Sequence, residues 1–275
     1  MTIMNVTLHP EAAWLAMDTA WAEVAAERAQ PSPTASAQEQ TAYMFADPAP
    51  PAKIVAHREK LLLLGEQRVV VGVSGSMALT VTLLETLRQT SAQVPLTLDV
   101  LAFEVMRPLL RQLRGSLPAR EAWGMAIVLG WSDIEDRAAG ATFAASDDFE
   151  FHPLGDGCAM NPPPHPRDPA YHELHRLSGE AGEGREVERF HREAAANQFR
   201  TSWGGLYRRG WATGGDLWFA QVTCEGASAR SLGPLTGAFE RPPRRPDPDW
   251  LDDLVSNAAE RRAAEARRSA AHGHA

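Results

Sequence analysis

The chain has 275 residues, of which 44% are hydrophobic and 23% are charged, so it can bury a substantial core and is not disordered as a whole. Thirty-five acidic and 27 basic residues give a net charge of −8, which argues against a protein that mainly neutralises nucleic-acid phosphates. No apolar run is long enough to span a membrane, and the first residues lack the pattern of a secretory signal. Two cysteines, Cys158 and Cys224, allow at most one disulfide. We therefore expect a cytoplasmic protein that binds neither membranes nor nucleic acid.

The first elements expected along the chain are strands. Residues 3–8 and 12–17 alternate or run apolar on either side of a turn, which predicts an N-terminal hairpin. Residues 22–52 are rich in Ala, Pro, Ser, Glu and Gln and indicate a long insertion. Residues 60–64 and 68–73 are two short apolar runs around a Gly-Glu-Gln turn, and they predict a second hairpin.

A helix pair is expected next, because the apolar period changes after Ser74-Gly75-Ser76. Met77, Val81, Leu84 and Leu87 fall on one predicted helical face that ends near residue 90. A second helix is expected over residues 97–113, with Pro108 as a kink. Further strands are expected at 122–130, 141–145, 149–154 and 217–223, with a helix at 185–207.

This order of elements predicts an α+β domain over residues 1–240 in which helices cover stacked sheets. The remaining residues, 241–275, form a Pro/Arg-rich linker followed by an expected helix at 249–271. We interpret that tail as an exposed appendage or a docking element.

Thr2 is a candidate nucleophile. Threonine is small enough for removal of Met1 to be routine, and a free α-amino group with a pKa of about 8 can act as the base for the hydroxyl of its own residue. The chain also has only two lysines, Lys53 and Lys60. In a chain that otherwise uses arginine, a retained lysine suggests a role that needs a tunable pKa.

The order of these residues resembles that of the N-terminal-nucleophile hydrolases, specifically the proteasome β-subunits and the bacterial peptidase that partners an ATP-dependent unfoldase. Thr2 precedes Asp18 by sixteen residues, and Lys60 precedes Gly75 by fifteen, with Gly75 in the run Val-Val-Gly-Val-Ser-Gly-Ser. Thr213-Gly214-Gly215 resembles the small-Gly-Gly turn before the family's late strand. The likeness spans about residues 2–225 with interruptions.

The resemblance implies a four-layer α/β/β/α sandwich with a long insertion and a C-terminal helical tail. It implies a threonine peptidase or amidohydrolase that acts on a peptide or amide substrate with no metal or cofactor. Thr2 would attack, Lys60 would lower the pKa of the hydroxyl, Asp18 would hold the lysine, and Gly75 would donate its N–H to the oxyanion. It also implies a homo-oligomeric ring or stacked assembly, whose unfoldase partner, if one exists, is unknown.

Candidate supporting residues of this site are Ser76, Asp156 and Thr213. Two positions depart from the family, because Asp156 stands in a Gly-Asp-Gly turn where the family has serine, and Gly210 stands where it has aspartate. An inactive subunit of the same fold, with a structural or scaffold role, is therefore the main alternative.

Other functions are open alternatives. Gly72-Val73-Ser74-Gly75-Ser76 resembles the metal-binding turn of von Willebrand factor A domains, with glycine where that turn needs aspartate. The same run is a weak match to a phosphate-binding loop. Two sets of residues complete the alternatives: a loose group of possible metal ligands, His152, His165, His172, Glu173 and His175, and three tryptophans interpreted as core or interface residues, Trp203, Trp211 and Trp218.

Overall fold

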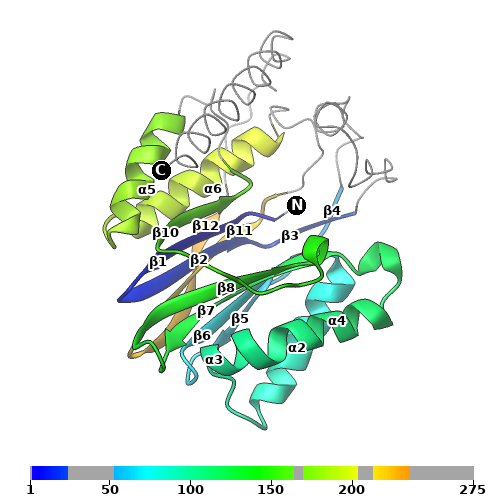
Figure 1. Cartoon of the computed structure of the whole chain (residues 1–275). Helices are drawn as coiled ribbons and strands as arrows, with labels where there is room; N and C mark the ends of the chain where they lie inside the picture. The colour runs from blue at the N-terminus through cyan, green and yellow to red at the C-terminus, as the bar shows by residue number, and fades with distance from the viewer. Residues whose placement is uncertain (1, 24–52, 164–169, 204–212, 236–275) are drawn as a thin grey trace, which may run out of the picture. The chain divides into compact units, whose positions relative to one another are not determined.

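The computed structural model describes residues 2–23, 53–163, 170–203 and 213–235 (Figure 1). Within these residues the chain is a mixture of helices and antiparallel sheets, as the sequence predicts. No helix in the described ranges combines the length and apolarity needed to cross a membrane. The predicted tail helix at 249–271, most of the insertion at 22–52, and Gly210 lie outside the described residues.

One sheet contains both N-terminal strands. Its order is β10-β1-β2-β11-β12, and every neighbouring pair is antiparallel. The strands are β1 (Met4–His9), β2 (Ala12–Asp18), β10 (Gly157–Asn161), β11 (Asp216–Thr223) and β12 (Gly226–Pro234). The predicted N-terminal hairpin is therefore confirmed, whereas β10 and β12 were not expected.

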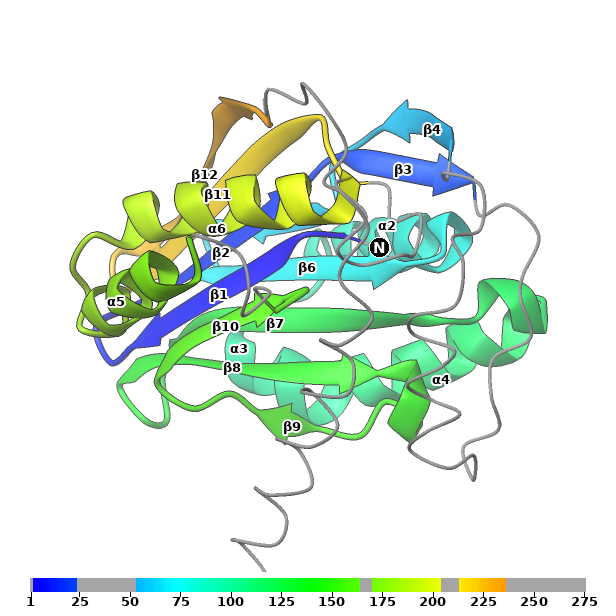
Figure 2. The same ribbon diagram turned by 90° about the horizontal axis from the view of Figure 1, so that it is seen from above.

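The second sheet has the order β5-β6-β7-β8-β9 and is also antiparallel throughout. Its strands are β5 (Leu61–Leu64), β6 (Val69–Gly75), β7 (Gly124–Ser132), β8 (Arg137–Ala144) and β9 (His152–Pro153). A separate two-stranded ribbon pairs β3 (Ala20–Glu23) with β4 (Lys53–His57) at one end of the sheets (Figure 2). Strand β3 thus includes the first two residues of the predicted insertion at 22–52, and β4 begins directly after its last residue.

The two sheets pack face to face through an apolar cluster to which both contribute. Because side chains alternate along a strand, Met4, Val6 and Leu8 of β1 point into this cluster, while Asn5 and Thr7 point to the other face. Val70 and Leu129 enter the cluster from the second sheet and are fully buried.

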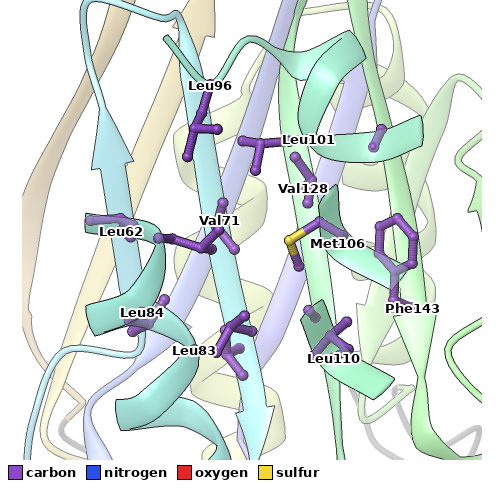
Figure 3. Packing of buried hydrophobic residues seen from close by; sticks show 14 of the residues in the cluster. Leu62, Val71, Leu83, Leu84, Leu96, Leu101, Met106, Leu110, Val128 and Phe143 are labelled. Atoms are coloured by element: carbon purple, nitrogen blue, oxygen red, sulfur yellow. The ribbon is translucent and has the colours of Figure 1, made fainter. Parts of the chain in front are cut away.

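Helices cover the outer faces of both sheets (Figures 1 and 2). Three helices lie on the second sheet: α2 (Met77–Ser91), α3 (Leu98–Val100) and α4 (Met106–Ser116). Figure 3 shows their leucines and Met106 against Val71, Val128 and Phe143 of the strands. On the first sheet lie α5 (Tyr171–Gly182) and α6 (Val187–Trp203), and α5 was not expected.

The helix pair after β6 differs in detail from the sequence prediction. Leu84 and Leu87 are buried as expected, but Met77 and Val81 are 46% and 43% exposed, because α2 turns Leu79 and Leu83 toward the sheet instead. The second predicted helix is continuous in space but contains a π-helical turn at Leu101–Val105, just before Pro108. A proline lacks the N–H that a regular turn requires, so the irregularity is expected at this position.

Candidate active site

Three buried polar side chains meet where the first strand of the chain begins. The Lys60 Nζ donates to Thr2 Oγ1 at 2.9 Å and to Asp18 Oδ1 at 3.1 Å. Thr2, Asp18 and Lys60 are 5%, 1% and 2% exposed. Three of the four proposed catalytic residues therefore contact one another although they are up to 58 positions apart in the chain.

The strand pairing explains why these residues meet. Met4 pairs with Met17 in the antiparallel β1–β2 hairpin, so Thr2, before β1, lies opposite the end of β2 that carries Asp18. Lys60 precedes β5, and its carbonyl accepts the Val73 N–H of β6 at 2.9 Å. The ion pair between Asp18 and Lys60 thus connects the two sheets.

Asp18 is held by backbone groups as well as by the lysine. Its Oδ1 accepts the Ile3 N–H at 2.9 Å, and its Oδ2 accepts the Gly214 N–H at 3.0 Å. The first contact fixes the chain next to Thr2, and the second fixes the loop before β11. The carboxylate therefore organises the N-terminal segment, the lysine and the 213–215 turn together.

Burial shapes the electrostatics of this pair. Burial lowers the pKa of Lys60 from its ordinary value, and the Asp18 carboxylate opposes the shift. Burial likewise raises the pKa of Asp18, while Lys60 and the Gly214 N–H oppose that shift. A charged pair in such a position depends on its hydrogen bonds, because an unpaired buried charge is very costly.

Gly75 ends β6 in a position where a side chain cannot fit. A Cβ atom there would lie 2.5 Å from both the Gly124 Cα and the Trp123 carbonyl oxygen. Ser76 follows as the N-cap of α2, with its Oγ accepting the Leu79 N–H at 3.0 Å and donating to the Glu121 carbonyl. The Ser76 side chain therefore caps the helix and contacts none of Thr2, Asp18 and Lys60.

The other two candidate supporting residues lie in different places. Thr213 is fully buried and adjoins Gly214, so it borders the site. Asp156 precedes β10, which pairs with β1 so that Gly157 faces Leu8, at the opposite end of β1 from Thr2. There the Asp156 carboxylate forms an ion pair with Arg137 and stands apart from the lysine group.

Sequence reasoning did not identify Trp21 and Thr19 as neighbours of this site. The Lys60 Nζ lies over the Trp21 ring, 5.3 Å from its centroid. Thr19 Oγ1 accepts the Asp216 N–H at 3.0 Å and so ties the residue after Asp18 to the start of β11. The available signal was their position within three residues of Asp18, before the insertion starts.

The structure contradicts the von Willebrand alternative. Its metal turn requires a parallel sheet, but β6 pairs antiparallel with both β5 and β7. An aspartate in place of Gly72 would also not fit, since a Cβ there would lie 2.5 Å from Met17 Sδ in the core between the sheets. The Ser76 Oγ already accepts the Leu79 N–H at the start of α2, which is one of the groups that a phosphate-binding loop would use.

The histidine alternative also finds no support in the described residues. No group of three or more His, Cys, Asp or Glu side chains within them has metal-binding geometry, and His165 lies outside the described ranges. His172 and His175 lie on α5 beside Tyr171, whose ring they contact edge-on. Of the three tryptophans, Trp218 is half-buried on β11, and the side chains of Trp203 and Trp211 lie outside the described residues.

A surface cavity of about 230 Å³ lies away from the lysine group. Its lining includes Leu98, Phe103, Phe151 and the Arg137–Asp156 pair. The cavity is therefore at the end of the sheets where Asp156 lies, and Thr2, Asp18 and Lys60 do not line it.

Comparisons with known proteins give a structural likeness but no family or curated relative. No protein-family model matches the chain, and no curated protein matches it. A solved structure of the Gly-1 mutant of Anbu from Hyphomicrobium sp. strain MC1 is similar, with 13% sequence identity and a TM-score of 0.49. The match covers 97% of this chain and 100% of the Anbu chain.

Proposed function

We propose that this chain is an N-terminal threonine hydrolase that cleaves peptide or amide bonds, with Thr2 as the nucleophile after removal of Met1. The observation that carries the proposal is the contact of 2.9 Å between the Lys60 ammonium and the Thr2 hydroxyl, beside the buried Asp18 carboxylate. Burial of a lysine against a threonine hydroxyl costs free energy of folding, and activation of that hydroxyl would explain why the arrangement is present.

The fold supports the same proposal. Two antiparallel sheets share one core, and helices cover the outer face of each. This arrangement supports the four-layer α/β/β/α sandwich that the resemblance to proteasome β-subunits implies. Asp156, whose replacement of a serine argued against activity, lies at the far end of β1 from Thr2. The Asp156 carboxylate therefore has no part in the proposed chemistry at Thr2.

In the proposed reaction the Thr2 Oγ1 attacks the substrate carbonyl carbon, and its proton passes to the free α-amino group of the same residue. The Lys60 charge favours the developing alkoxide, and Asp18 keeps that charge in place. The amine of the substrate then leaves with the proton, and an ester to Thr2 remains. Water, deprotonated by the α-amino group, hydrolyses this ester and regenerates the hydroxyl.

Gly75 is proposed to stabilise the tetrahedral intermediate through its backbone N–H. Val73 is bonded to the carbonyl of Lys60, so Gly75, two residues further along β6, lies at the lysine end of the strand. A glycine allows the substrate carbonyl to approach the backbone closely. Ser76 keeps the start of α2 rigid and so supports this turn indirectly.

The second candidate is an inactive subunit of the same fold with a structural role. It is favoured by the burial of Thr2, which is only 5% exposed and so offers little access to a substrate. Release of Met1 is the event that separates the two candidates, because only then does Thr2 carry the free α-amino group that acts as the base.

Assembly and location complete the proposal. We expect a cytoplasmic homo-oligomer, in a ring or a stacked arrangement, because a self-complementary surface usually closes with symmetry. An unfoldase that delivers substrates would be a natural partner, and its identity stays open. Light scattering that finds only a 30 kDa monomer over the micromolar range would contradict this assembly.

The hydrolase proposal is tested with a peptide epoxyketone, an electrophile that reacts with the hydroxyl and the free amine of one N-terminal residue. Intact mass spectrometry should show one adduct on the wild type and none on Thr2→Ala. Lys60→Ala and Lys60→Arg should label at least about a hundredfold more slowly, because neither keeps a compact charge beside the hydroxyl. Lys53→Arg is the matched control and should label at the wild-type rate. A mature wild type that begins at Thr2 and takes no adduct would favour the inactive subunit.

A further inference from the structure

Trp21 covers the lysine of the proposed site. The Lys60 Nζ lies 5.3 Å from the centroid of its ring and over the ring face. The Trp21 side chain is 5% exposed, so water is largely excluded from the space between ring and ammonium. This geometry is that of a cation–π interaction, which is strongest when the cation is desolvated.

The backbone around Trp21 holds the ring in this position. Trp21 pairs with Ala56 across the β3–β4 ribbon, and the Arg58 N–H donates to the Thr19 carbonyl at 2.9 Å. The Trp21 Nε1–H donates back to the Arg58 carbonyl at 3.4 Å. The segment that carries Asp18 and the segment that carries Lys60 are therefore tied together on both sides of the indole.

Three groups surround the Lys60 ammonium within the described ranges: the Thr2 hydroxyl, the Asp18 carboxylate and the Trp21 ring. Two of its three protons go to Thr2 and Asp18, and the ring face is the remaining electron-rich group recorded beside it within the described ranges. Asp18 on β2 is the charged group that faces Lys60 in these ranges. The neighbours of Lys60 on its own segment are all exposed: His57, Arg58 and Glu59.

We propose that Trp21 is a positioning residue of this site, whose ring face keeps the Lys60 ammonium charged and directed at the Thr2 hydroxyl. The effect on the lysine stands by itself, and its consequence for Thr2 rests on the proposed hydrolase function. Asp18 supplies a counter-charge on one side of the ammonium. On another side the negative face of the indole ring replaces part of the hydration that the ammonium loses on burial. Trp21 thus opposes the loss of the proton that burial favours.

The chain offers an unusually clean test, because Lys60 and Lys53 are its only lysines. Labelling lysine with ¹³C at Cε gives two signals, and Lys53→Arg assigns them, so the Lys60 pKa can be followed directly by NMR. At position 21, tryptophan is replaced site-specifically by its mono-, di- and trifluorinated forms. Fluorine weakens the negative ring face while it keeps the shape of the indole and its Nε1–H.

The expected result is a stepwise fall in the Lys60 pKa along the series, by about one unit in total. The same fluorinated residues at Trp14 are the matched control. They should leave the Lys60 pKa unchanged, because Trp14 lies in the apolar cluster between the first sheet and helices α5 and α6. A Lys60 pKa that is the same across the Trp21 series, or that moves equally with the Trp14 series, overturns the proposal.

A second measurement separates this inference from the proposed function. In the mature protein, the rate of epoxyketone labelling should fall along the Trp21 series, and its pH profile should move with the Lys60 pKa. If the wild type takes no adduct while the lysine titration still shifts, the hydrolase function fails and the positioning of Lys60 stands. If labelling proceeds equally in every fluorinated variant and the pKa does not move, the role of Trp21 fails and the hydrolase function stands.

Discussion

His191 predicts a specific loss of stability in acid. It lies on α6 and is fully buried, with its ring edge-on to Phe190 and Phe219 at centroid distances of 5.2 and 5.3 Å. Its Nε2 lies 3.1 Å from Thr7 Oγ1, whereas its Nδ1 has no hydrogen-bond partner within the described residues. Burial lowers the pKa of His191 to about 3. The ring is therefore neutral in the folded protein at every pH near neutrality.

The magnitude follows from the pKa difference. In the unfolded chain the histidine takes up a proton below about pH 6.5, while the folded chain does not do so until about pH 3. The unfolded state therefore binds more protons in this window, and stability falls as the pH falls. At about pH 5, some 1.5 units below the unfolded pKa, the loss is about 2 kcal/mol relative to about pH 8.

Urea denaturation at about pH 8 and about pH 5 measures this effect. His191→Gln cannot titrate, so its unfolding free energy should fall between the two pH values by about 2 kcal/mol less than that of the wild type. His172→Gln removes a histidine exposed on α5 and should keep the wild-type pH dependence. A His191→Gln protein that loses as much stability as the wild type would refute the reasoning.

Three further predictions concern stability and use the same urea assay. Asp18→Leu alone should cost about 3–5 kcal/mol because it leaves Lys60 buried without its counter-charge. The addition of Lys60→Met should recover only part of that loss, since the Ile3 and Gly214 N–H groups still lack their acceptor. Gly75→Ala should destabilise by about 1–3 kcal/mol, since the Cβ would meet backbone at 2.5 Å. Gly115→Ala should have the opposite sign and stabilise by about 0.5–1 kcal/mol, because nothing lies within 4 Å of its Cβ position on α4. Opposite or absent effects would contradict each argument.

Local sequence patterns predicted the parts of the fold that have strong periodicity. The N-terminal hairpin and the β5–β6 hairpin follow from apolar runs on either side of turn residues. The meeting of Thr2, Asp18 and Lys60 was inferred only from the order and spacing of a family resemblance, since it depends on two sheets packing together. Local propensity alone contains no information about that contact.

The features that the sequence did not reveal have identifiable causes. Strand β12 has mostly small and polar residues, so it lacks an apolar alternation, and it is a strand because β11 supplies its partner. Helix α5 is short and follows a proline-rich segment, and its apolar face rests on only Leu174, Leu177 and Ala181. Asp156 was matched to a serine by the flanking glycines, which report a turn and not its distance from Thr2.

Tandem mass spectrometry of the N-terminal peptide from epoxyketone-treated protein tests the central claim most directly. The proposed mechanism requires that this peptide begin at Thr2, because a retained Met1 would acylate the amine that serves as base. It also requires that the adduct lie on Thr2 itself, where Lys60 contacts the hydroxyl at 2.9 Å. A peptide that starts at Thr2 and carries the adduct is the predicted result. A peptide that retains Met1, or an adduct that maps to any other residue, would contradict the account.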